Sequence, residues 1–385
     1  MFDIIIGGCG FSGAVLANIL AERYQKRVLI LEQRGQIGGN MSDYRDQSGI
    51  IVHRYGPHIF HTNDREVFEY LSRFTEWFPY EHRVVGKIDG RLVPIPFNLT
   101  ALETLFERDK AELIKAALRR EYDRAKVPVL ELLGAEDPLI REFGQFVFEK
   151  VFVHYTAKQW GIPAEKVDIS VLNRVPVCLT YDDRYFSDAI QAMPQNGFTP
   201  LFERLLANER ITVELRQDAL KRISLRDRQI YFDGEPFSGI YIHTGPTDAL
   251  FGYCFGHLPY RSLRLEFETL ETAEFQPCAV VNYPNEEQFT RITEFCHFTS
   301  ESRSNRETVV LREYPQAYEE GRFPPYYPMN NPQTEHQFEQ YQELAGEYPG
   351  LVLCGRLAEY RYYNMDQCVK RAMELADILG RPDKK

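Results

Sequence analysis

The stretch IIIGGCGFSG, residues 4–13, decides how the first part of this chain folds. Residues 2–6 form a short apolar run, which predicts a buried parallel strand, and residues 13–23 carry apolar side chains at helical spacing. A second apolar run occupies residues 27–31 and ends at Glu32. The sequence therefore predicts a strand, a glycine-rich turn, a helix and a second strand.

The turn carries the pattern GxGxxG, with Gly8, Gly10 and Gly13 at its three glycine positions. Glu32 follows Gly13 by 32 − 13 = 19 positions, the spacing expected for a carboxylate that binds a ribose hydroxyl. Glycines let the backbone approach a pyrophosphate, and the free N–H groups at the start of the helix favour the anion. In this context we interpret the pattern as a dinucleotide site and not as a chance glycine turn.

The segment RGQIGGN, residues 34–40, favours FAD over NAD as that dinucleotide. A second glycine pair after the second strand is typical of flavoproteins in which FAD lies extended along the domain. The chain has no second GxGxxG and so no evident NAD(P)H module. We therefore expect any flavin to be reduced from outside.

Composition excludes several other classes of protein. The 385 residues include 56 acidic and 45 basic side chains, so the net charge of −11 argues against a nucleic-acid partner. Seven cysteines lie without a CxxC pair or zinc-like spacing, so we expect no metal site and a cytoplasmic protein with reduced thiols. Residues 4–21 lack charge, but four glycines interrupt them, so we expect no membrane span.

The remaining chain predicts an α/β core (α+β overall) assembled from separated segments. A Rossmann-like FAD-binding domain is assigned to residues 1–80, 197–250 and 345–385. Residues 98–170 form a helical-bundle insert, within which residues 138–161 carry one apolar stripe. Residues 81–97, 171–196 and 251–344, rich in short alternating runs, form an antiparallel β-sheet domain for the substrate.

Eight segments, in order along almost the whole chain, resemble the UDP-galactopyranose mutase family. They are GGCGFSG (7–13), QIGGN (36–40), HRYGPHIFHTN (53–63), YTAKQWG (155–161), YDDRYF (181–186), TRITEF (290–295), REYP (312–315) and GRLAEYRYYNMD (355–366). The family fold is a flavin domain interrupted by a helical bundle and an antiparallel sheet.

The resemblance implies a redox-neutral isomerase that interconverts UDP-galactopyranose and UDP-galactofuranose. In the family, N5 of reduced FAD attacks the anomeric carbon and UDP leaves; the sugar opens, recloses as the furanose, and UDP returns. The implied partners are a UDP-sugar, an external flavin reductant and a second copy of the chain in a homodimer. The product would supply galactofuranose for a surface polysaccharide.

The resemblance also implies the cofactor site. The last helix begins near Asn364 and would direct its N-terminus at the negatively charged edge of reduced flavin. The implied cofactor-binding residues are Gly8, Gly10, Phe11, Gly13, Glu32, Gln33, Gly39, Asn40, His58, Ile59, Arg356, Asn364, Met365 and Asp366.

For the substrate, the resemblance implies that Arg174 and Arg291 clamp the diphosphate, since arginine binds phosphate through two parallel hydrogen bonds. His58 and His61 are the other implied catalytic residues and would modulate flavin N5 and the sugar oxygens. The further substrate-binding positions are His82, Phe152, Tyr155, Thr156, Trp160, Tyr185, Asn282, Tyr314 and Tyr362.

Four positions depart from the family pattern: His82, Val151, Cys178 and Asn364. They leave a related sugar nucleotide open, and two alternatives of other classes are considered beside it. The first of these three is a mutase for UDP-N-acetylgalactosamine or a dTDP-sugar. A second is an FAD-dependent oxidoreductase of the amine-oxidase type. A third is a nucleotide-sugar-binding protein without activity.

Overall fold

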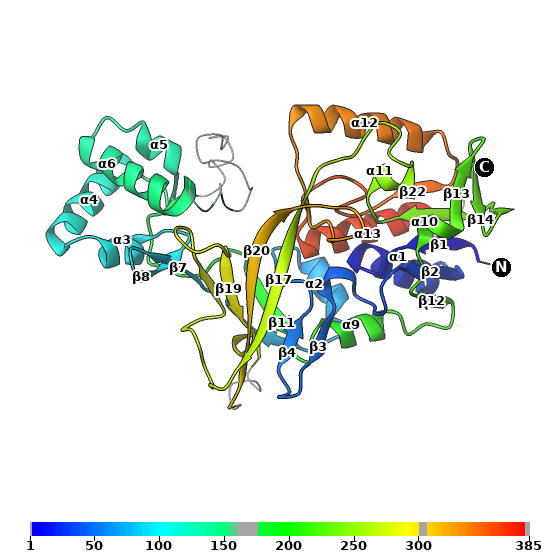
Figure 1. Cartoon of the computed structure of the whole chain (residues 1–385), viewed down its shortest axis with the longest axis horizontal. Helices are drawn as coiled ribbons and strands as arrows, with labels where there is room; N and C mark the ends of the chain where they lie inside the picture. The colour runs from blue at the N-terminus through cyan, green and yellow to red at the C-terminus, as the bar shows by residue number, and fades with distance from the viewer. Residues whose placement is uncertain (1, 154, 156–157, 159–175, 300–305, 382–385) are drawn as a thin grey trace.

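The computed structural model describes residues 2–153, 155, 158, 176–299 and 306–381. A five-stranded parallel sheet forms its centre, in the order β12-β2-β1-β16-β22, and lies at the right of Figure 1. Its strands are β1 (Ile4–Gly7), β2 (Val28–Glu32), β12 (Ile211–Leu215), β16 (Ile240–His243) and β22 (Leu351–Leu353). The predicted strand, glycine turn, helix and strand are confirmed.

Both faces of this sheet are covered, which explains why its strands read as continuous apolar runs. Ile4 and Ile6 pack toward helix α1 (Phe11–Glu22), whereas Ile5 packs on the other face with the hairpin of β13 (Ile223–Arg226) and β14 (Gln229–Phe232). Helices α9 (Phe198–Leu205) and α13 (Met365–Gly380) complete the first layer. Helix α13 contacts α1, so the last helix returns to the glycine turn.

A seven-stranded sheet, antiparallel except between β18 and β7, forms the middle of the molecule. Its order is β21-β17-β20-β19-β18-β7-β8, and the long pair β17 and β20 runs between the other two parts in Figure 1. The strands are β7 (Val84–Ile88), β8 (Arg91–Ile95), β17 (Tyr260–Leu270), β18 (Val280–Asn282), β19 (Arg291–Glu294), β20 (Thr308–Ala317) and β21 (Tyr327–Pro328).

A cluster of short helices lies at the far end of the molecule from the parallel sheet (Figure 1). It contains α3 (Leu99–Leu105), α4 (Arg108–Glu121), α5 (Val129–Leu133) and α6 (Pro138–Val147) around a separate core that includes Phe97 and Phe143. The predicted stripe over 138–161 is partly confirmed: α6 ends at Val147 and continues as a π-helical turn, Phe148–Val153.

Smaller elements join these parts. A three-stranded sheet pairs β5 (Phe60–Thr62), β11 (Ile190–Pro194) and β6 (Trp77–Pro79). The others are β3 (Asp43–Arg45), β4 (Ile51–His53), α2 (Arg65–Ser72), β9 (Lys126–Pro128), β10 (Pro176–Cys178), α10 (Ala219–Arg222), β15 (Glu235–Pro236) and α11 (Thr247–Leu250).

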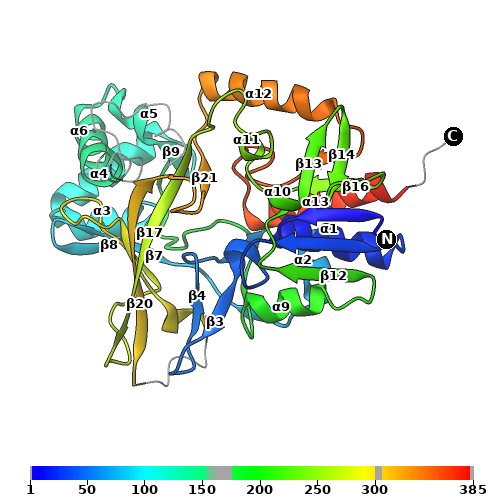
Figure 2. The same ribbon diagram turned by 45° about the vertical axis from the view of Figure 1, so that its right-hand side comes forward.

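One long helix differs from the sequence expectation. Helix α12 (Pro332–Gly346) begins within the segment 251–344, which is expected to belong to the antiparallel sheet domain, and extends two residues beyond it. It packs against β22 and α11 above the parallel sheet, as Figure 2 shows. Asn331 caps this helix and proline follows as its first residue, a start signal that was overlooked. Within the described residues, no helix is long and apolar enough to cross a membrane.

Candidate active site

The glycine turn and the second glycine pair meet above the parallel sheet. A Cβ on Gly13 would lie 2.1 Å from the carbonyl oxygen of Gly8, so only glycine fits at this position in the first turn of α1. Gly39, at φ +55°, would place a Cβ 2.9 Å from the Cα of Gly10. The four predicted glycines therefore form one close-packed corner at the N-terminus of α1, where a phosphate can approach the backbone.

Glu32 is held at the edge of this corner. Its buried carboxylate accepts hydrogen bonds from the backbone N–H of Cys9 at 2.8 Å and from that of Arg34 at 2.9 Å. Gln33 beside it is exposed, whereas the ring of Phe11 packs against Phe202 with centroids 4.8 Å apart. Glu32 thus stands where the spacing predicted a ribose-binding carboxylate, and Phe11 contributes packing.

Three buried polar atoms near this corner and the cleft have no hydrogen-bond partner in the described part of the chain: Arg34 Nη1, His58 Nδ1 and the Tyr326 hydroxyl. Arg34 donates through Nη2 to Asn40 at 3.0 Å, and its guanidinium lies 4.1 Å from the ring centroid of Tyr55. Because a buried polar atom without a partner is costly, these atoms fit a polar ligand. Sequence reasoning missed Arg34 and Tyr326, although Arg34 lies only two positions after Glu32.

The N-terminus of α13 forms the opposite wall. Arg356 donates from Nε to the carbonyl oxygen of Tyr363 at 3.0 Å, and its guanidinium lies near the ring of Tyr362. Asn364 is the N-cap residue of α13, as the expected start of the last helix near Asn364 requires. Asp366 accepts from the Thr62 hydroxyl at 2.8 Å and fastens α13 to β5.

A cleft of about 170 Å³ opens between this wall, the seven-stranded sheet and the segment 180–189. It brings together six of the eleven predicted substrate-binding residues, His61 and five of the predicted cofactor residues, from widely separated segments of the chain. Its lining comprises Pro57, His58, Ile59, His61, His82, Val84, Tyr155, Tyr185, Phe186, Val280, Asn282, Arg291, Tyr327, Arg356, Tyr362, Asn364 and Met365.

Among the described residues that line the cleft, two are arginines: Arg356, described above, and Arg291. Arg291 lies directly opposite Glu313 in the β19–β20 ladder and donates from Nε to the Glu313 carboxylate at 2.7 Å. Burial is the largest influence on the pKa of Arg291 and acts to lower it, but the charge of Glu313, the hydrogen bond to Glu313 and the neighbouring tyrosines together raise that pKa. Arg291 therefore remains charged, with its two Nη groups available to an anion. Sequence reasoning missed Glu313.

The tyrosines of the cleft remain neutral hydroxyls at neutral pH. Burial raises the pKa of Tyr155 and of Tyr185, although the positive charge of Arg291 acts in the opposite direction. Burial also raises the pKa of Tyr362 to about 12. These side chains can therefore donate hydrogen bonds to phosphate or sugar oxygens without adding negative charge.

The cleft histidines differ in their surroundings. Burial lowers the pKa of His58 well below its usual value, and the His58 backbone N–H donates to Nδ1 of His53 at 3.0 Å. Burial lowers the pKa of His82 to about 3, and Nδ1 of His82 lies 3.2 Å from the Tyr80 hydroxyl. His61 instead contacts Asp188, with Nδ1 and Oδ2 3.0 Å apart. His58 and His82 are thus uncharged at neutral pH.

Five of the predicted substrate-binding positions are not in the cleft lining. Tyr314 lies on β20 with its ring 3.8 Å from the Arg264 guanidinium, so its substrate role stays a prediction. Arg174, Thr156 and Trp160 lie outside the described residues, and only the backbone of Phe152 is described.

The two other departures from the family pattern lie away from the cleft lining. Val151 is buried in the core of the helical insert. Cys178 is buried on β10, and burial raises the pKa of its thiol.

One cluster of potential metal ligands was not foreseen. Glu294, Cys296 and His297 bring their ligand atoms within 4.8 Å of one another. The Glu294 carboxylate, however, accepts from the Thr308 hydroxyl at 2.8 Å and from the backbone N–H groups of Phe275 and Gln276, both at 2.8 Å. Donors already surround this carboxylate, so the cluster fits a hydrogen-bonded junction of strands better than a metal centre.

The fold and the cleft define a protein with a Rossmann-like dinucleotide-binding domain beside a polar cleft lined by arginines, tyrosines and histidines. The sequence model of UDP-galactopyranose mutase matches residues 150–362, and that of the NAD(P)-binding Rossmann-like domain matches residues 5–74. The chain belongs to the UDP-galactopyranose mutase family, whose members are isomerases acting on nucleotide sugars.

Individual relatives cover nearly the whole chain. The UDP-galactopyranose mutase of Mycoplasma pneumoniae is 35% identical and covers 98% of this chain and 96% of its own length. A probable UDP-galactopyranose mutase of Klebsiella pneumoniae is also 35% identical, over 97% of this chain and 94% of its own. The dTDP-fucopyranose mutase of Escherichia coli is 32% identical over the full length of both chains.

The crystal structure of a reduced UDP-galactopyranose mutase supports the fold. It matches with a TM-score of 0.72 at 18% identity, covering 99% of this chain and 94% of its own. A variant of putrescine oxidase matches with a TM-score of 0.54 at 12% identity, covering 98% of each chain. The architecture is therefore shared with enzymes of different names, and only the family relatives bear on the activity.

Proposed function

We propose that this chain interconverts UDP-galactopyranose and UDP-galactofuranose with bound FAD in its reduced state. The single observation that carries the proposal is the cleft itself. It places a charged arginine, neutral tyrosines and uncharged histidines beside the helix-terminus wall of a dinucleotide domain. Full-length relatives named UDP-galactopyranose mutase support the choice of substrate.

FAD fits the residues at the dinucleotide corner. The crowded glycines admit a diphosphate, Glu32 stands at the ribose position, and the buried Arg34 Nη1 supplies a donor that otherwise lacks an acceptor. The N-terminus of α13 and Arg356 would face the isoalloxazine ring. When bound and reduced, the flavin supplies a nucleophilic nitrogen for the anomeric carbon of the sugar.

The chain's own residues bind and orient the nucleotide sugar. Arg291, fixed by Glu313, holds the diphosphate while the bond between sugar and UDP is broken, so UDP is retained for its return. Tyr155, Tyr185 and Tyr362 donate hydrogen bonds without adding charge. In the full proposal Arg174 joins the clamp, an external reductant keeps the flavin reduced, two copies form a homodimer, and the product serves a surface polysaccharide.

A dTDP-deoxysugar is the second candidate substrate. The observation in its favour is the dTDP-fucopyranose mutase of Escherichia coli, which aligns over the whole chain. His82, at a position often occupied by asparagine in the family, lies in the cleft and is a residue at which two such sugars would be distinguished.

The test uses the dithionite-reduced holoenzyme. UDP-galactofuranose and dTDP-fucofuranose are supplied separately, and the products are separated by chromatography. Formation of UDP-galactopyranose without net consumption of reductant supports the proposal, whereas preferential turnover of dTDP-fucofuranose assigns the second substrate. Equal conversion by the oxidised protein, or hydrogen peroxide formed with an amine, contradicts both.

A further inference from the structure

His61 lies in the cleft with its two ring nitrogens in different environments. Nδ1 is 3.0 Å from Oδ2 of Asp188, and the ring stacks on Phe186 with centroids 3.6 Å apart. His61 is part of the cleft lining, and Phe186 separates it from His82, whose ring also stacks on Phe186. The ring is thus fixed in place, with Nδ1 facing Asp188 and Nε2 at its opposite side.

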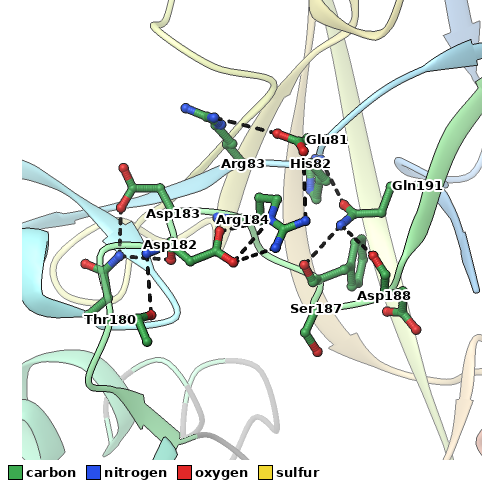
Figure 3. A network of polar contacts seen from close by, with 12 residues as sticks. Glu81, His82, Arg83, Thr180, Asp182, Asp183, Arg184, Ser187, Asp188 and Gln191 are labelled. Carbon is green, nitrogen blue, oxygen red and sulfur yellow. Dashed lines mark hydrogen bonds and ion pairs between the residues drawn. The ribbon is translucent and has the colours of Figure 1, made fainter. Parts of the chain in front are cut away.

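Asp188 belongs to the segment of residues 179–189, named here the strap, which leads from β10 to β11. Figure 3 shows Asp182, Arg184 and Asp188 along the strap, with Gln191 beside Asp188. Gln191 donates to the carbonyl oxygens of Phe186 at 3.1 Å and of Asp188 at 3.3 Å, and accepts from the His82 backbone N–H at 3.2 Å. These hydrogen bonds connect the strap, at Phe186 and at Asp188 itself, to Gln191 on β11.

A directed chain of hydrogen bonds decides which nitrogen of His61 carries the proton. The Ala189 backbone N–H can only donate, and it donates to Oδ1 of Asn63 at 2.9 Å. This places the Asn63 amide NH₂ toward Asp188, where it donates to Oδ1 at 2.9 Å. The other oxygen of Asp188 can only accept, so Nδ1 of His61 must donate.

We propose that Asp188 is a positioning residue that keeps the proton of His61 on Nδ1 and leaves the Nε2 lone pair toward the cleft as a proton acceptor for the sugar. This inference rests on the proposed function. In ring contraction the bond from C1 to O5 breaks and that from C1 to O4 forms. As the ring opens, O5 gains the proton that the attacking flavin nitrogen would give up. As the ring recloses, His61 Nε2 accepts the proton of O4 and returns it to that nitrogen when it leaves, with no net change.

Asp188→Asn is the informative variant. Because Asn63 still presents its NH₂ group, the new amide must turn its oxygen toward Asn63 and its NH₂ toward His61. His61 Nδ1 then becomes the acceptor, and the proton moves to Nε2. We expect kcat to fall about 10- to 100-fold, with KM changed less than about threefold, because proton transfer and not binding is lost.

Two further variants complete the set. Asp188→Glu keeps the carboxylate and should recover most of the lost kcat. Asp182→Asn makes the same charge change on the exposed side of the strap, where Asp182 pairs with Arg184 at 2.7 Å, and should keep kcat within about twofold.

The readouts are steady-state kinetics of the reduced holoenzyme and nitrogen NMR of ¹⁵N-histidine-labelled protein, with His61→Asn used for assignment. The expected result is a protonated Nδ1 in the wild type and a protonated Nε2 in Asp188→Asn, accompanied by the loss of kcat. Unchanged kcat in Asp188→Asn, or a protonated Nε2 in the wild type, overturns the inference. Failure of the wild type itself to interconvert the two sugars would instead reject the proposed function.

Discussion

Replacing Arg291 by alanine should have two separable consequences. The change removes the cation that we propose to hold the diphosphate. It also removes the partner that Glu313, only 1% exposed, contacts at 2.7 Å. The double variant Arg291→Ala/Glu313→Gln removes the cation but leaves a neutral amide in place of the stranded carboxylate, so it separates binding from stability.

The two magnitudes follow from the geometry. The Nη groups of Arg291 can make two charge-assisted hydrogen bonds to phosphate at about 1.5–3 kcal/mol each, or about 3–6 kcal/mol together. Since about 1.4 kcal/mol corresponds to a tenfold change in kcat/KM, the value of kcat/KM should fall by about two to four orders of magnitude. Breaking a buried pair costs about 3–5 kcal/mol, but the Arg291 side chain is 29% exposed, so we expect a stability loss of about 1–3 kcal/mol.

The assay combines kcat/KM of the reduced enzyme with urea unfolding of each variant. Arg291→Ala should lose both activity and stability while its flavin stays bound. The double variant should regain most of the stability and none of the activity. If the double variant recovers activity as well, the loss came from the stranded carboxylate, and Arg291 does not bind the diphosphate. If Arg291→Ala is as stable as the wild type, the reasoning about the buried pair is wrong.

Two other predictions concern the cofactor corner and acid stability. Gly13→Ala should lose FAD, measured as flavin absorbance after gel filtration, because its Cβ would lie 2.1 Å from the Gly8 carbonyl; Gly346→Ala, with no atom within 4 Å, is the control and should stay yellow. Burial lowers the pKa of His53 to about 4, so the unfolded chain binds this proton first. His53 should therefore contribute a loss of stability of up to about 1.4 kcal/mol per pH unit as the pH falls from about 6.5 to about 4, in addition to the losses from His58 and His82. His53→Phe should flatten this slope in urea titrations; an unchanged slope would show that His53 is not its source.

Sequence periodicity predicted those elements whose signals are local. The first strand, the glycine turn, α1 and the second strand follow from consecutive residues, and α13 follows from its own apolar face. Helix α12 was missed because its cap, Asn331, lies in a stretch rich in proline and tyrosine that resembles the neighbouring strands. The π-helical turn after Val147 was missed because its backbone departs from the helical period.

The site shows a similar division. Arg291 and His61 were found from motifs. Glu313 lies in the quoted segment REYP but was not recognised as the partner of Arg291, and Asp188 lies in none of the quoted segments. Arg291 meets Glu313 because of the register between β19 and β20. His61 meets Asp188, 127 positions away, because β5 pairs with β11. Such partners become visible only when strand pairing is known.

By itself, the sequence determined where the backbone must turn tightly and which residue types can bind phosphates, because both depend on single side chains or their absence. Gly13 needs no neighbour to be recognised as a place for close approach. The tertiary structure decided which charges are paired and which carboxylate a histidine contacts. These properties belong to pairs of residues, and strand register and burial bring each pair together across the chain.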